Sequence, residues 1–205
     1  MIRRLLLDRQ GDTIAEFALV LPLLLVLLFG IVDSGRFLWE VNRAEKATQA
    51  GARFAVVAAP LAPGLATANY VGVDGLTQGD TIPASELGTV TCNQTACCNP
   101  TSLCATPYPT LGTYNATSTS VFTNLSKRMQ VLDPAIQPAN ILVSYSGSGL
   151  GFAGNPNGAQ ISPIVTVKLT GVQFKPITFF LFKTITLPDF RTSLTAEDLS
   201  GTQSN

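Results

Sequence analysis

Hydrophobic residues form a long continuous run near the start of the chain. Residues 14–32 are apolar, small or uncharged except for Glu16. About 20 consecutive apolar residues in a helix cross the hydrocarbon core of a bilayer. The run therefore predicts a transmembrane helix over residues 12–33, preceded by a leader at 1–11.

Beyond this run the hydrophobic spacing becomes that of an amphipathic helix. Apolar or small residues recur every three or four positions, and charged residues fall on the opposite face. The apolar positions are Phe37, Val41, Ala44, Thr48, Gly51 and Ala55, and the charged ones are Arg36, Glu40, Arg43, Lys46 and Arg53. Pro60 and Pro63 end the pattern because proline lacks an N–H donor. We expect one helix over residues 12–59, with an amphipathic extension at 34–59.

The extension also carries a seam of small residues that would let another backbone approach closely. Its members are Ala44, Ala47, Gly51, Ala55 and Ala58. The seam could pack on the chain's own globular domain or on a neighbouring subunit. We favour the first alternative, and both can hold at different points along the helix.

Residues 60–205 are expected to form one extracytoplasmic globular domain. The part at 60–115 is rich in Pro, Gly and Thr and predicts loops around a cysteine cluster. The part at 116–205 predicts a helix near 121–132 and strands at 141–145 and 164–169. Further strand candidates are the apolar residues 177–182 and either 185–187 or 190–194. The expected fold is α+β, with a small antiparallel sheet packed on the long N-terminal helix.

Charge and composition argue against several classes of function, among them nucleic-acid binding and histidine-based catalysis. Thirteen basic and thirteen acidic residues balance, and the only basic cluster is the leader's Arg3, Arg4 and Arg9, so a nucleic-acid partner is not expected. Basic residues before the apolar run and Asp33 after it favour a cytoplasmic N-terminus. The chain contains no histidine, which removes His-based triads and imidazole metal sites. No nucleotide-binding motif is present, and we expect neither a cofactor nor an enzyme activity.

The four cysteines Cys92, Cys97, Cys98 and Cys104 lie close together in the sequence. Their even number and clustering in an exported domain favour two disulfides. A bond between adjacent Cys97 and Cys98 would strain the backbone, so we expect each to pair with Cys92 or Cys104. Each small loop would contribute about 2–3 kcal/mol to stability. A zinc site has the required four ligands but lacks paired C-x-x-C spacing, and we favour the disulfides.

Glu16 is the residue that most needs an explanation. A carboxylate near the centre of a membrane helix costs about 2.5–3.5 kcal/mol, and less towards the interface. A glycine followed five residues later by a glutamate, as in Gly11 and Glu16, resembles the site that prepilin peptidases cut in type IV pilins. The Glu16-Phe17 pair and the later Gly-Arg-Phe-Leu stretch resemble, more specifically, the TadE-like pseudopilins of the tight-adherence (Tad/Flp) pilus.

This resemblance covers residues 9–59 well and 138–195 loosely, and it does not account for the cysteine-containing middle. It implies cleavage between Gly11 and Asp12 by a prepilin peptidase, and partners among other pilins, pseudopilins and the pilus assembly machinery. It places the chain in a bacterial inner membrane, with its C-terminal domain in the periplasm or beyond. Major tight-adherence pilins are much shorter, so the resemblance suggests a minor subunit or an assembly or priming factor.

The resemblance also assigns a role in subunit engagement to Glu16, and we expect the adjacent Phe17 to belong to the same site. Cleavage would expose an ammonium group on Asp12, which Glu16 of an incoming subunit could pair with in a low-dielectric bundle. Removing one partner of a buried ion pair costs about 3–5 kcal/mol, so such pairing would favour one register. Asp12 is a departure from the pilin pattern. Its carboxylate lies beside the new ammonium group and weakens the electric field of that group at Glu16.

Two other interpretations remain open. The chain could be a single-pass membrane protein whose outer domain binds a ligand or partner unrelated to pili. It could also be a secreted domain whose first thirty or so residues are a removed signal. The apolar run is longer than a usual signal core, and residues 30–34 offer no small-x-small cleavage site. We therefore favour an anchor that is retained or trimmed only at Gly11.

Overall fold

The computed structural model describes residues 9–98, 104–105, 118–156, 158–178, 183–196 and 199, with the side chains of 9–13 and 104–105 left out. The chain divides into two compact units. The first comprises Met1–Val41 and Gln173–Thr186, and the second comprises Asn42–Val172 and Leu187–Asn205. The chain thus leaves the second unit after Val172 and returns to it at Leu187.

The helix α2 (Arg9–Val57) forms the N-terminal part of both units and contains 49 residues. Its sequence is rich in Leu, Ala, Val and Phe, and Pro22 lies inside it without ending it. The backbone N–H of Ala58 still donates to the carbonyl of Phe54, at 3.0 Å. Pro60, which has no N–H to donate, follows two residues later. The expected helix is confirmed, with an end close to the predicted one.

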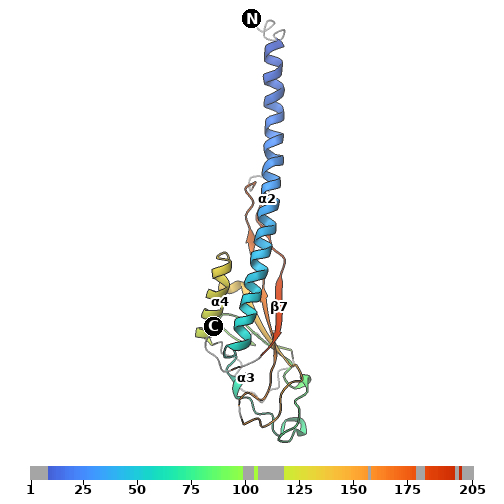
Figure 1. Ribbon diagram of the computed structural model, residues 1–205, viewed down its shortest axis with the longest axis vertical. Helices are drawn as coiled ribbons and strands as arrows, with labels where there is room; N and C mark the ends of the chain where they lie inside the picture. Colours follow the sequence, from blue (N-terminus) through green and yellow to red (C-terminus); the bar gives the residue numbers. More distant parts are fainter. Residues whose placement is uncertain are drawn as a thin grey trace. The chain divides into compact units, whose positions relative to one another are not determined.

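The first unit pairs its part of α2 with a hairpin of two short strands. These are β5 (Gln173–Phe174) and β6 (Ile185–Thr186), which are antiparallel with Phe174 opposite Ile185. The hairpin lies beside α2 (Figure 1), and the Phe174 ring meets the Phe37 ring edge-on with centroids 5.5 Å apart. The Arg36 guanidinium also lies 5.5 Å from the centroid of the Phe174 ring.

The second unit is built on an antiparallel sheet in the order β2-β1-β3-β4-β7. Its strands are β1 (Thr89–Cys92), β2 (Cys104–Ala105), β3 (Ile141–Ser146), β4 (Ile164–Leu169) and β7 (Phe190–Thr195). Residues of β3 and β4 alternate between fully buried and partly exposed. This alternation is typical of a sheet with one face against the core.

Helices cover the buried face of this sheet. The C-terminal part of α2 and α4 (Thr119–Leu132) lie side by side (Figure 1). The fully buried core includes Leu125 and Met129 of α4, Tyr145 and Val143 of β3 and Leu169 of β4. A helix layer on one face of an antiparallel sheet makes the second unit α+β, which confirms the expected fold class.

Residues 60–98 consist mainly of loops with short elements among them, and residues 99–103 and 106–115 of the segment predicted as loops lie outside the described residues. The short elements are α3 (Gly64–Thr67), the 3₁₀ turns η1 (Val73–Gly75) and η2 (Ala84–Glu86), and β1; a further turn, η4 (Pro138–Asn140), precedes β3. The strand β1 was not predicted. It is only four residues long, and its place in the sheet comes from pairing with β3.

The C-terminal half differs from expectation at one segment. The helix α4 and the strands β3 and β4 are confirmed, and both candidates for the last strand exist as β6 and β7. The segment 177–182 was predicted as a strand, but Ile177 and Thr178 lie in a turn, and residues 179–182 lie outside the described residues. The backbone N–H groups of that turn are bound by a carboxylate of α2 instead of a neighbouring strand.

Candidate membrane anchor and assembly segment

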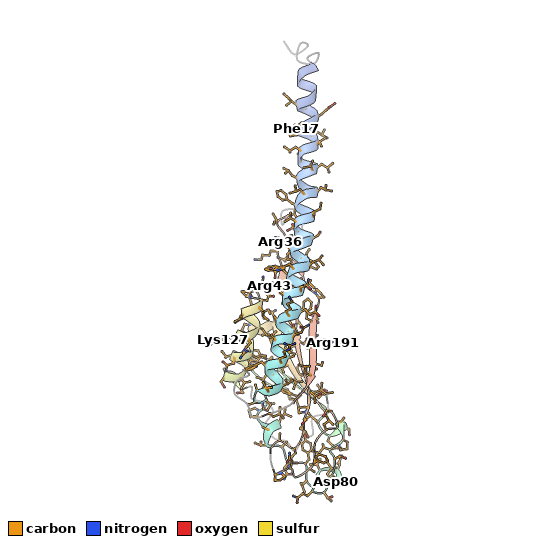
Figure 2. The ribbon with its side chains drawn as sticks, viewed as in Figure 1. Phe17, Arg36, Arg43, Asp80, Lys127 and Arg191 are labelled. Atoms are coloured by element: carbon orange, nitrogen blue, oxygen red, sulfur yellow. A yellow bond between two sulfur atoms is a disulfide. The ribbon has the colours of Figure 1, made fainter. Side chains whose placement is uncertain are left out.

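The apolar run of α2 is exposed on all sides in the first unit. Phe17, Leu19, Leu23 and Ile31 are between 64% and 78% exposed. Figure 2 shows Phe17 on this part of the helix. The most apolar window of this helix is 0% buried within the protein, and the helix is long and apolar enough to cross a membrane. An exposed apolar surface of this length needs a nonpolar environment. The run fits a single-pass membrane protein.

Glu16 lies on the outside of α2 next to Phe17, and both are exposed. Among the described side chains, Glu16 has no ion-pair partner. The predicted cleavage site, between Gly11 and Asp12, lies within the first turns of α2, and its side chains are outside the description. The structure therefore places the glycine and the glutamate on one helix at the N-terminal end of the apolar run.

Asp33, the first residue after the run, makes several polar contacts within the first unit. Its Oδ1 accepts from the backbone N–H of Ile177 at 2.7 Å. Its Oδ2 accepts from the N–H and the hydroxyl of Thr178 at 2.9 and 2.8 Å. Arg36 forms an ion pair with Oδ1 at 3.2 Å. Asp33 therefore fixes the turn of the β5–β6 hairpin to α2. Sequence reasoning missed this contact, because it treated Asp33 only as a charge that follows the run.

The small-residue seam of α2 belongs to the second unit and packs against the other elements of that unit. Ala44, Ala47, Gly51, Ala55 and Ala58 are all buried. A Cβ atom at Gly51 would lie 2.8 Å from Sδ of Met129 on α4, so a larger residue there would require the Met129 side chain to move. The structure thus shows the favoured alternative, in which small residues bring α2 close to its own domain.

An arginine of α2 also binds the C-terminal end of α4. Arg43 Nε donates to the carbonyl of Leu132 at 3.1 Å, and Arg43 Nη2 lies 3.3 Å from Oδ1 of Asp133. The Asp133 side chain is 0% exposed, whereas that of Arg43 is 22% exposed. The positive charge of Arg43 therefore compensates a buried carboxylate where α4 ends. The sequence placed Arg43 on the polar face but gave no indication of its partner.

The cysteine cluster contains a disulfide between Cys92 and Cys97, which are five positions apart. Cys98 is also disulfide-bonded. The side chain of Cys104 lies outside the described residues, so the second expected pairing stays a prediction. The Cys92–Cys97 bond joins the end of β1 to the loop that follows it.

Two acidic residues of the loop segment, Asp80 and Glu86, have pKa values that are shifted in opposite directions. Asp80 Oδ2 accepts from the N–H and the hydroxyl of Thr77, both at 2.7 Å, and these hydrogen bonds lower the pKa of Asp80. Burial raises the pKa of Glu86, and the charge of Asp74 raises it further. Within the part of the chain that the structure describes, no three His, Cys, Asp or Glu side chains are grouped as a metal site.

Comparison with known proteins agrees with the resemblance of the N-terminal segment. Residues 11–53 match the family model described as TadE-like protein. The matched segment contains the apolar run, Glu16, Asp33 and most of the amphipathic extension, and in this segment the chain is similar to TadE-like proteins. A search of curated proteins and a search of solved structures gave no match.

Proposed function

We propose that this protein is a TadE-like pseudopilin that acts as a minor subunit or an assembly or priming factor of a tight-adherence pilus. The observation that carries the proposal is the exposed apolar run, with Glu16 near its N-terminal end, inside the segment that matches the TadE-like family. Such a helix can be held in lipid and later transferred into a helical bundle.

The proposed layout follows the four segments of the sequence. Residues 1–11 are a cytoplasmic leader, 12–33 span the bacterial inner membrane, 34–59 extend the helix, and 60–205 form the extracytoplasmic domain. A prepilin peptidase removes the leader after Gly11. The second unit, with its own sheet and core, is much larger than the membrane segment, which supports a minor or accessory role by analogy with the family.

Glu16 is proposed to select the register of the subunit. After cleavage, the carboxylate of an incoming chain pairs with the ammonium group on Asp12 of a neighbour. The exposure of Glu16 supports this role, since its carboxylate is accessible to another helix. Inside a bundle this ion pair would be poorly hydrated, and a subunit lacking the carboxylate would leave an unpaired charge.

The test uses the full chain in cells that make Tad pili but lack their own copy of this protein, together with the matching prepilin peptidase. The parent chain should begin at Asp12 in the intact mass of the membrane-extracted protein, and Gly11→Leu should keep its leader. Glu16→Leu should insert and be cut normally, yet fail to co-purify with pilus components and fail to restore pili. Glu16→Asp, which keeps the charge, should restore them at least in part.

Leu23→Ile is the matched control, because Leu23 is an exposed apolar residue of the same helix and the change keeps its character. It should behave like the parent. An intact leader despite active peptidase would contradict the cleavage, and a start beyond Asp33 would identify a removed signal. If Glu16→Leu supports normal pili, the proposed charge pairing is wrong.

A further inference from the structure

The β5–β6 hairpin is held at the point where the apolar run of α2 ends. Asp33 follows Val32 directly, and it accepts hydrogen bonds from the N–H groups of Ile177 and Thr178. Within the first unit, the turn of the hairpin is therefore fixed at the level at which a helix spanning 14–32 would leave the hydrocarbon. Free N–H groups are unfavourable at this depth, and Asp33 satisfies two of them.

The surface around this turn is apolar and bordered by lysines. Ile177 and Ile185 are 43% and 44% exposed, and Leu38 of α2 is 61% exposed. Lys175 and Lys183 are exposed on the two arms of the hairpin, and the sequence between them contains no other charged residue. Lysines that flank an apolar segment place their ammonium groups among lipid headgroups while their stems lie along apolar surface.

A groove separates the hairpin from α2 on this side. It has a volume of about 580 Å³ and is lined by Gly30, Phe37, Leu38, Phe174, Pro176 and Ile185, among others. Its lining is mainly apolar, with Asp33, Ser34 and Thr178 as its polar members, and it includes Gly30, which lies inside the apolar run. The groove therefore continues the apolar surface of the membrane segment past Asp33.

We propose that the described part of the β5–β6 hairpin is a second membrane contact, with the turn at Ile177 and Thr178 in the outer headgroup region and acyl chains against the apolar groove. Lys175 and Lys183 bind anionic headgroups, and Asp33 positions the turn. This inference rests on the membrane-spanning assignment of 14–32 made in the proposed function. A lipid surface is favoured over a protein partner because the patch is continuous with the exposed run and is bordered by lysines.

The test measures quenching of a single tryptophan by lipids brominated close to the headgroup. Trp39 is the only tryptophan, so a Trp39→Phe background permits one new probe at a time. The full chain is reconstituted in phosphatidylcholine vesicles containing phosphatidylglycerol. The Ile185→Trp variant should be quenched at least about twofold more than Val131→Trp, since tryptophan at a membrane interface lies near the headgroups. Val131 is an 82% exposed apolar residue of α4 in the second unit.

A third probe, Leu24→Trp, separates the two proposals because Leu24 lies within the apolar run. If deep-brominated lipids fail to quench Leu24→Trp, the membrane assignment itself is wrong. If they quench Leu24→Trp, but Ile185→Trp is quenched no more than Val131→Trp, only the hairpin contact is overturned. In that case the patch faces water or a protein partner.

Two further variants test the assigned residues in the Ile185→Trp background. Asp33→Ala removes both acceptors and should reduce the quenching to about the level of Val131→Trp. Asp33→Asn keeps one acceptor oxygen and should retain part of the quenching of the Ile185→Trp probe. Lys175→Gln with Lys183→Gln should reduce quenching in vesicles with phosphatidylglycerol more than in pure phosphatidylcholine. Unchanged quenching in Asp33→Ala, or no difference between the two lipid compositions, would overturn the corresponding role.

Discussion

Glu86 shows how a single buried carboxylate can set the pH dependence of the second unit. Its Oε2 is buried and has no hydrogen-bond partner among the described atoms. Burial raises the pKa of Glu86, Asp74 raises it further, and burial together with the Glu86 charge raises the pKa of Tyr70. The folded state therefore favours the protonated form of Glu86 more than the unfolded state does.

The sign of the resulting pH dependence follows from linkage. The pKa of Glu86 is higher in the folded state than in the unfolded state. The stability associated with protonated Glu86 is therefore fully present below the unfolded pKa, about 4.3, and is lost as pH rises through the pKa of the folded state. Glu86→Gln stays neutral and should remove this loss. The difference in melting temperature between Glu86→Gln and the parent should thus grow from pH 4 to pH 7, measured by circular dichroism of the detergent-solubilised chain.

Asp80 provides a control of opposite sign, because hydrogen bonds from Thr77 lower its pKa. The stability contributed by ionised Asp80 is present above the unfolded pKa of about 3.9. It is lost as pH falls through the pKa of Asp80 in the folded state. Asp80→Asn should therefore lower the melting temperature relative to the parent more at pH 7 than at pH 3. If the melting temperatures of Glu86→Gln and the parent change in parallel with pH, Glu86 is not the source of this pH dependence.

At the scale of elements, an ion pair and a close approach are among the contacts that join α2 and α4. Met129 of α4 packs over Gly51, and Arg43 binds both Leu132 and Asp133 (Figure 2 shows Arg43 on α2). Asp133 Oδ1 also accepts from the N–H of Ala135, so the carboxylate fixes the chain where α4 ends. Arg43 therefore supports both the helix pair and the turn that leads to β3.

Removal of Arg43 should destabilise the second unit strongly. Arg43→Met keeps much of the side-chain volume but leaves the buried Asp133 charge without its partner, which costs about 3–5 kcal/mol. Adding Asp133→Asn should recover part of this loss. Thermal and urea unfolding of the solubilised chain would measure both effects.

Arg53→Met is the matched control, since Arg53 is an exposed arginine of the same helix. Its effect should stay within about 0.5 kcal/mol, as for most surface substitutions. An equal effect of the Arg43 and Arg53 changes would show that the ion pair contributes little.

At the scale of the whole chain, the hairpin is an insertion between two adjacent points of the second unit. The N–H of Leu187 donates to the carbonyl of Val172 at 2.8 Å, so the chain leaves and re-enters the unit at neighbouring positions. The sheet of the second unit contains neither β5 nor β6. Loss of the inserted segment should therefore leave this sheet and its core intact.

Replacing Gln173–Thr186 by a short Gly-Ser link tests this independence. The second unit should keep the Cys92–Cys97 disulfide, its protease resistance and its melting temperature, because the link joins ends that already meet. Replacing Ile141–Ser146, the central strand β3, by the same link is the control and should abolish folding. A large drop in melting temperature on excision of the hairpin would show that the two units fold together.

The sequence alone determined the features that depend on local periodicity. The apolar run, the amphipathic extension, α4, β3 and β4 follow from the spacing of hydrophobic residues, which repeats within each element. The resemblance to TadE-like proteins rests on the same N-terminal segment, and the family match confirms it there. Glu16 could be singled out because an isolated charge in an apolar helix is conspicuous without a fold, whereas Gly11 and Phe17 were singled out by the resemblance to pilins.

Only the tertiary structure decided the contacts between distant parts of the chain. Asp33 and Ile177 are separated by 144 positions, and Arg43 and Leu132 by 89, so no local pattern links them. The turn at Ile177 and Thr178 was taken for a strand because its apolar composition is that of one, whereas its N–H groups bind a carboxylate. Hydrophobic spacing specifies which face of an element is buried, but the partner that buries it or satisfies its polar groups is set by the packing of the whole chain.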